Sequence, residues 1–164
     1  MQPTRIELLQ RMPVFGAIND DTLQFLLQQA RTVDVLGGDY FFREGDPAHS
    51  MFVLEAGRVA VLRHWQGSEL ALNHLGVGDC FGEMALLGLF PRSAAVCAEE
   101  DCRAIELTAA DLLLLFERDA EQFALVQMNI AREVCRRLRA TDELLFRAWM
   151  GERPAALDTA FLAV

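Results

Sequence analysis

The spacing of apolar residues divides the chain into three stretches. Over residues 6–30 they recur at helical intervals, and Pro13 and Gly16 interrupt the stretch, which predicts two short helical pieces. Over residues 32–107 the apolar runs shorten and are separated by turns, as in β-strands. From Thr108 onward the helical spacing returns and persists to Trp149.

The middle stretch contains six β-rich runs, with glycine-containing corners between most of them. The runs cover residues 33–36, 40–42, 51–54, 59–62, 70–72 and 104–107. Short strands at this spacing predict a small antiparallel barrel or sandwich. Because helices precede and follow it, the expected fold class is α+β.

The last stretch opens with a variant capping box, Thr108 with Asp111, and continues as a long helix from about Ala120 to Trp149. Its apolar stripe consists of Phe123, Val126, Ile130, Val134, Leu138, Thr141, Leu145 and Ala148. One small barrel cannot cover so long a stripe, which predicts a homodimer through a parallel helix of a second copy. The alternative is that the stripe packs back on its own barrel.

Composition narrows the class of protein. With 164 residues, 52% of them hydrophobic, the chain is long and apolar enough for one domain without metal or disulfide staples. A formal charge of −9, spread along the chain, argues against a nucleic-acid surface. No secretory signal or membrane-spanning run is present, so we expect a cytoplasmic protein without membrane contact.

The four cysteines, Cys80, Cys97, Cys102 and Cys135, form no CxxC pair and are expected to be reduced core thiols.

Candidate chemistry is concentrated between Phe81 and Val96. The glycine turn and short helix that begin at Phe81 leave backbone N–H groups free to hold an anion. Arg92 can supply the formal charge and two parallel bonds to a phosphate, and Ser93 adds a hydroxyl. Glu83 would repel a phosphate unless it accepts a hydrogen bond from a sugar hydroxyl, so the pair is typical of a sugar phosphate site. By spacing alone, Glu83 and Arg92 can equally form a structural salt bridge.

The string Phe-Gly-Glu-Met-Ala-Leu-Leu, three further residues and then Pro-Arg-Ser-Ala resembles the phosphate-binding cassette of the cyclic-nucleotide-binding domain family. Further resemblance lies in the Glu-Gly-Asp turn at 44–46, in 51–59 and in 75–79. The resemblance implies a jelly-roll β-sandwich flanked by short N-terminal helices and a long C-terminal helix. The ligand-binding residues that it implies are Phe81, Gly82, Glu83, Met84, Ala85, Arg92, Ser93, Ala94, Thr141 and Asp142. It implies no catalytic residue, metal or further cofactor.

Within that family the chain is most similar to bacterial catabolite-activator-like proteins, in which a long helix dimerises and reaches the base. The stretch 136–143 resembles that region and brings Thr141 and Asp142 near the base. These residues can accept a hydrogen bond from the amino group of adenine, whereas Ser93 can meet the 2-amino group of guanine. We therefore expect cAMP in preference to cGMP. Trp149 is expected in the core or the dimer seam, with stacking on the base as the alternative.

The resemblance divides the chain into residues 1–119, with the N-terminal helices and the β-roll, the long helix 120–150, and a tail 151–164. That tail is too short for the helix-turn-helix of the family's transcription factors, so signalling to an unknown protein is expected in place of DNA binding. Its apolar residues Leu157, Phe161, Leu162 and Val164 either dock a partner or pack on the domain. Nucleotide binding is expected to order the cassette, shift a hinge at 108–116 and move the long helix over the base.

Three other functions compete with this interpretation. An enzyme would need His49, His64, His74, Cys80 or Glu83 as metal ligands or acid–base groups, but no motif supports it. The second competitor is an interaction module with the same fold that binds no nucleotide. The third is a receptor for another anion, such as a cyclic dinucleotide.

Overall fold

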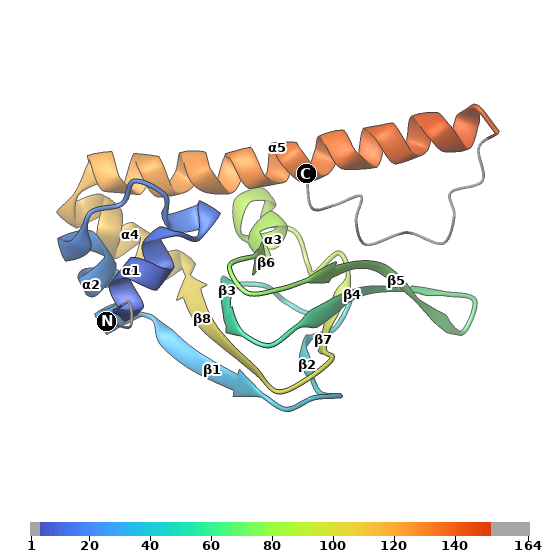
Figure 1. Cartoon of the computed structure of the whole chain (residues 1–164), viewed down its shortest axis with the longest axis horizontal. Helices are drawn as coiled ribbons and strands as arrows, with labels where there is room; N and C mark the ends of the chain where they lie inside the picture. Colours follow the sequence, from blue (N-terminus) through green and yellow to red (C-terminus); the bar gives the residue numbers. More distant parts are fainter. Residues whose placement is uncertain (1–3, 152–164) are drawn as a thin grey trace.

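Two four-stranded antiparallel sheets form the body of the protein in this computed structural model, which describes residues 4–151 (Figure 1). The first sheet has the order β1-β8-β3-β6 and the second β2-β7-β4-β5. The strands are β1 (Arg31–Val35), β2 (Tyr40–Phe42), β3 (Ser50–Ala56), β4 (Val59–Trp65), β5 (Ser68–Leu75), β6 (Cys80–Phe81), β7 (Ala95–Ala98) and β8 (Cys102–Thr108). This is the α+β jelly-roll sandwich that the sequence predicts.

Helices precede and follow the sandwich in the described chain, and one short helix lies between β6 and β7 (Figure 1). They are α1 (Arg5–Gln10), the 3₁₀ turn η1 (Pro13–Phe15), α2 (Asp20–Gln29), α3 (Glu83–Gly88), α4 (Ala109–Arg118) and α5 (Ala120–Trp149). The capping box at Thr108 is present, since its hydroxyl accepts from the Asp111 backbone N–H at 3.1 Å and its own N–H donates to the Asp111 carboxylate at 2.8 Å. No helix within residues 4–151 is long and apolar enough to cross a membrane.

Strand β3 is apolar without alternation because both of its faces are buried. Met51 and Val53 belong to a core shared with the N-terminal helices, α4 and α5. Phe52 and Leu54 point the other way, into a second core with residues of β4, β6 and β7. A continuous apolar run of this kind is expected of a strand that is covered on both sides.

The apolar stripe of α5 divides between two environments. Val126 and Ile130 are fully buried in the protein's own core, and Phe123 packs against that core. Leu138 and Leu145 are 57% and 56% exposed. The stripe expected from the sequence is therefore not a continuous dimer contact. Its first half packs on the protein's own domain, which is the alternative that the sequence left open.

A second stripe on α5 is exposed along its whole length. It consists of Met128, Ala131, Cys135, Leu138, Asp142, Leu145 and Trp149. Intervals of three and four residues alternate without exception, which is the a/d spacing of a coiled coil. The placement of Cys135 on this stripe corrects the expectation that all four cysteines are core thiols, which the buried Cys80 and Cys102 do fit. The tail residues Leu157, Phe161, Leu162 and Val164 lie outside the described residues.

Candidate functional site

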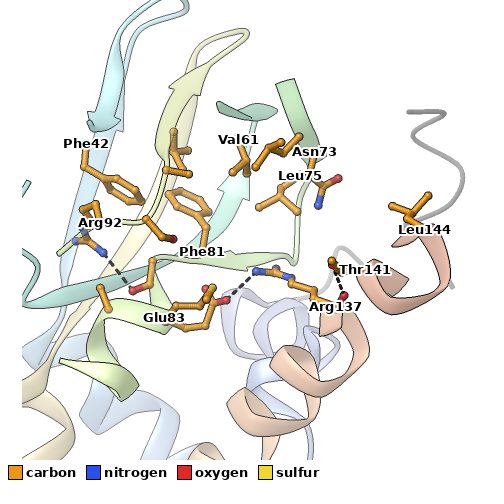
Figure 2. Close-up of a pocket in the computed structure, with 17 residues that line it drawn as sticks. Phe42, Val61, Asn73, Leu75, Phe81, Glu83, Arg92, Arg137, Thr141 and Leu144 are labelled. Atoms are coloured by element: carbon orange, nitrogen blue, oxygen red, sulfur yellow. Dashed lines mark hydrogen bonds and ion pairs between the residues drawn. The ribbon is translucent and has the colours of Figure 1, made fainter. Parts of the chain in front are cut away.

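A cavity of about 320 Å³ lies between the second sheet, α3 and the middle of α5 (Figure 2). Its lining residues are Phe42, Val61, Leu72, Asn73, Leu75, Phe81, Gly82, Glu83, Met84, Ala85, Arg92, Ser93, Ala94, Val96, Arg137, Thr141 and Leu144. Most of this wall is apolar, and a few charged and polar groups converge on it. Such a composition is typical of a site for a small organic ligand.

Arg92 is a buried cation in the wall of this cavity, with 6% of its surface exposed. Its Nη1 donates to the carbonyl oxygens of Ser50 and Gly82 at 2.8 and 3.1 Å, and its guanidinium lies 4.0 Å from the centre of the Phe42 ring. Its Nε is buried without a hydrogen-bond acceptor, and Arg92 forms no ion pair with a carboxylate in residues 4–151. Burial lowers its pKa, and nearby acids, chiefly Glu106, oppose that effect. The site therefore holds a positive charge that is short of an anionic partner.

Local backbone geometry fixes the place of Arg92. Gly82 has φ +80°, and a Cβ atom there would lie 2.5 Å from Arg92 Nη1, so only glycine lets the guanidinium reach its carbonyl. The backbone of Arg92 pairs with the 44–46 turn, because Arg92 N–H donates to Asp46 O at 3.0 Å and Gly45 N–H donates to Arg92 O at 2.8 Å. The turn and the cassette are thus one structural unit.

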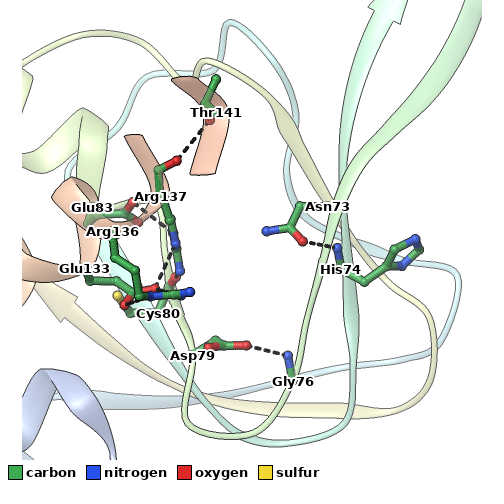
Figure 3. Close-up of polar contacts among 10 residues, drawn as sticks. All are labelled: Asn73, His74, Gly76, Asp79, Cys80, Glu83, Glu133, Arg136, Arg137 and Thr141. Carbon is green, nitrogen blue, oxygen red and sulfur yellow. Dashed lines mark hydrogen bonds and ion pairs between the residues drawn. The ribbon is translucent and has the colours of Figure 1, made fainter. Parts of the chain in front are cut away.

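Glu83 is the first residue of α3 and is 3% exposed. Its Oε1 accepts from Nη1 of Arg137, on α5, at 3.0 Å (Figures 2 and 3). This contact contradicts the alternative in which Glu83 and Arg92 form a structural salt bridge: the acid faces α5, and the base faces the β3 carbonyl. The two charged side chains of the cassette therefore have different surroundings. Arg92 lies in the cavity wall without a carboxylate partner, and Glu83 is paired with the long helix.

Arg137 connects several elements (Figure 3). Besides Glu83, its Nε donates to Glu133 Oε1 at 2.9 Å and its Nη2 donates to the carbonyl oxygen of Cys80. Burial disfavours its charge, but the carboxylates of Glu83 and Glu133 outweigh that effect and hold its pKa above the usual value. The same burial raises the pKa of the Cys80 thiol to about 12 and keeps it an inert thiol.

Glu133 gives this cluster a testable pH dependence. Burial alone would raise its pKa, but hydrogen bonds from Arg136 and the charges of Arg137 and Arg136 lower it below the usual range. A carboxyl whose pKa is lower in the folded state than in the unfolded state, where it is about 4.3, stabilises the fold at pH values above the unfolded-state pKa. This stabilisation is lost as the pH falls through the folded-state pKa. We expect Glu133→Gln to flatten the fall in unfolding free energy between pH 6 and 3, measured with urea. The exposed Glu117→Gln is the control, and an equal slope in both variants would contradict the assignment.

Nine of the ten ligand-binding residues implied by the sequence line the cavity, and the tenth, Asp142, does not. Asp142 is exposed on the second stripe of α5. Sequence reasoning missed Arg137, although it lies four residues before Thr141 and therefore on the same helical face. It also missed Phe42 and Asn73, whose contribution depends on how distant strands come together.

Comparison with known proteins identifies the family. The family model described as "Cyclic nucleotide-binding domain" matches residues 32–119. The chain belongs to the cyclic nucleotide-binding domain family. The sequence resemblance is thereby confirmed.

The relatives that the chain matches differ in how much of their length it covers. The chain is 38% identical over 131 residues to the "Cyclic AMP receptor protein" of Thermus thermophilus, covering 79% of this chain and 59% of that one. It is 35% identical over 91 residues to the "cGMP-dependent protein kinase" of Toxoplasma gondii, covering 56% of this chain and 9% of that one. The crystal structure of the Thermus thermophilus catabolite activator protein superposes with a TM-score of 0.72 at 33% identity, covering 81% of this chain and 61% of the other. The chain thus spans about three fifths of the Thermus protein and less than a tenth of the kinase.

Proposed function

We propose that this protein is a cyclic-nucleotide receptor without catalytic activity, whose ligand binds in the cavity beside Arg92. The observation that carries the proposal is the buried Arg92 guanidinium, which has an unpaired Nε and no ion-pair partner in the described chain. A cyclic phosphate carries one negative charge and oxygen acceptors, and so provides what Arg92 lacks. Equilibrium titration with cAMP and cGMP tests the proposal; a chain that binds neither leaves the interaction module or another anion, such as a cyclic dinucleotide, as the function.

The sugar of the ligand would meet Glu83. A ribose 2′-OH can donate to the Glu83 carboxylate, which already accepts from Arg137. The carboxylate then links the ligand to α5 through a single side chain. Nucleotide binding that changes the Glu83–Arg137 contact would change how firmly α5 is held, which is a means of signalling to a partner protein. We propose that this signalling takes place in the cytoplasm.

The base would lie between Thr141, Ser93 and the apolar residues of β4 and β5. Thr141 Oγ1 donates its proton to the carbonyl oxygen of Arg137 at 3.0 Å, so towards the cavity the hydroxyl can only accept. An acceptor suits the amino group of adenine better than the 6-carbonyl of guanine. We therefore favour cAMP over cGMP, in keeping with the longer match to the Thermus relative named a cyclic AMP receptor.

We further propose that two copies associate through the exposed a/d stripe of α5. We propose the parallel arrangement, in which each residue of the stripe meets its counterpart in the second copy. In a parallel pair each Cys135 faces its counterpart. Mild oxidation with glutathione disulfide should therefore give a disulfide-linked dimer from the wild type and from Cys97→Ser. Cys135→Ser should give none, and a Cys135 that stays unlinked at micromolar concentration would contradict the arrangement.

Asp142 makes this seam weak, because in a parallel pair it faces its own negatively charged copy. We expect Asp142→Leu to tighten dimerisation by about tenfold, as a polar residue at such a position lowers stability. Glu143→Leu adds the same side chain outside the stripe and is the matched control. Sedimentation equilibrium measures both dissociation constants, and equal values for the two variants would argue against the seam.

A further inference from the structure

A chain of polar contacts leads from Arg92 to the exposed side chain of Arg31 on β1, an edge strand of the first sheet. Ser50, the first residue of β3, is 6% exposed and holds Arg92 twice: its carbonyl oxygen accepts from Nη1 at 2.8 Å, and its Oγ accepts from Nη2 at 3.4 Å. The Ser50 hydroxyl donates in turn to Glu106 Oε1 at 2.8 Å. The other oxygen of Glu106, on β8, accepts from Nη2 of Arg31 at 2.7 Å.

The direction of each hydrogen bond follows from chemistry. A serine hydroxyl has one proton, and an ionised carboxylate can only accept, so the proton of Ser50 lies towards Glu106. The lone pairs of the hydroxyl are then left for Arg92 Nη2. Glu106 therefore fixes the rotation of the hydroxyl, and the hydroxyl fixes one end of the guanidinium.

Ser50 also acts as a spacer between opposite charges. A carboxylate in direct contact with Arg92 would neutralise it and compete with a ligand phosphate. Because the Ser50 hydroxyl lies between them, Glu106 is close enough to stabilise the positive charge of Arg92 but does not form an ion pair with it. The contacts use both protons of Nη1 and one of Nη2, which leaves Nε and the second proton of Nη2, on one edge of the guanidinium, for a bidentate anion.

We propose that Ser50 and Glu106 are positioning residues that hold Arg92 with this edge free for the phosphate of a cyclic nucleotide. The inference rests on the proposed function, since it concerns how that ligand is bound. Neither residue lines the cavity, so both act only through Arg92. Their effect is on the phosphate, which is common to all cyclic nucleotides, and is independent of the base.

The experiment is calorimetric titration of cAMP and cGMP into the full chain and its variants. We expect Ser50→Ala to weaken both nucleotides by the same factor, about tenfold, which corresponds to losing one hydrogen bond to a charged group. Ser50→Thr keeps the hydroxyl and should restore wild-type affinity. Ser68→Ala, an exposed serine at the start of β5, is the control and should bind as the wild type does.

A double-mutant cycle separates positioning from a general loss of structure. Glu106→Ala should also weaken binding, and Ser50→Ala combined with it should cost no more than the larger single effect, because both act through one hydroxyl. The side-chain Nε–H resonance of Arg92, followed by ¹⁵N NMR, should shift in both single variants. If the wild type binds but Ser50→Ala binds equally well, or loses only one of the two nucleotides, the inference is overturned; if the wild type binds neither, it is the proposed function that fails.

Discussion

Replacing Arg92 with alanine is expected to remove binding of cAMP and cGMP together, at a cost of about 2–5 kcal/mol, or roughly 30-fold to several thousand-fold in affinity. The effect is large because Arg92 is buried, lines the cavity and has no ion-pair partner among residues 4–151. The truncated site would bury a ligand anion without a free cation, because Arg137, the other arginine of the lining, is paired with Glu83 and Glu133. Calorimetric titration of both nucleotides measures the loss.

Two further variants make the Arg92 result specific. Arg103→Ala removes an exposed arginine that pairs with Asp34 and does not line the cavity, so it should leave affinity unchanged. Arg92→Lys keeps the charge but not the planar fork, so it should recover only part of the binding. Affinity within threefold of the wild type in Arg92→Ala would show that the phosphate, if it binds, binds elsewhere.

Replacing Arg137 with leucine is expected to lower the unfolding free energy by about 3–5 kcal/mol, the usual cost of breaking a buried ion pair by removing one partner. Glu83 and Glu133 would both lose a hydrogen-bonded cation, and Glu83 would be left almost fully buried. Urea unfolding at neutral pH measures the change. Adding Glu83→Gln to the Arg137→Leu protein removes the stranded charge and should recover part of the loss; no recovery would mean that Glu83 is not the residue affected.

Arg137→Leu should also uncouple the long helix from the ligand. In the wild type we expect saturating nucleotide to change amide exchange within residues 120–150, because the proposed ligand contact and the helix share the Glu83 carboxylate. In the variant that change should disappear. Identical exchange with and without nucleotide in the wild type would show that α5 does not respond to the site.

Much of the fold follows from local pattern. The caps at Thr108 and the bounds of the long helix are set by neighbouring residues, and the structure has α5 at Ala120–Trp149. Strands β6 and β7 were missed because each is short and lies beside the cassette, where turn signals dominate. The split of the α5 stripe also depended on distant residues: Asn129 donates to the carbonyl oxygens of Val14 and Gly16 at 3.2 and 2.8 Å and so ties the helix to η1.

The site was predictable where its residues are contiguous in sequence. Residues 81–85 and 92–94 of the cassette line the same cavity. The partner of Glu83 could not be found by spacing, because Arg137 is 54 residues away and reaches it only when α5 lies across α3. Ser50 and Glu106 are likewise ordinary strand residues until pairing of β3 with β8 brings their side chains together.

The measurement that tests the central claim most directly is a calorimetric titration of the wild-type chain with cAMP, cGMP and adenosine. A phosphate-centred site predicts saturable binding of the cyclic nucleotides, one per chain and tighter for cAMP, and no binding of adenosine, which lacks the phosphate. Adenosine binding as tight as that of cAMP would contradict the role of Arg92. Failure of both cyclic nucleotides to bind would contradict the receptor function itself.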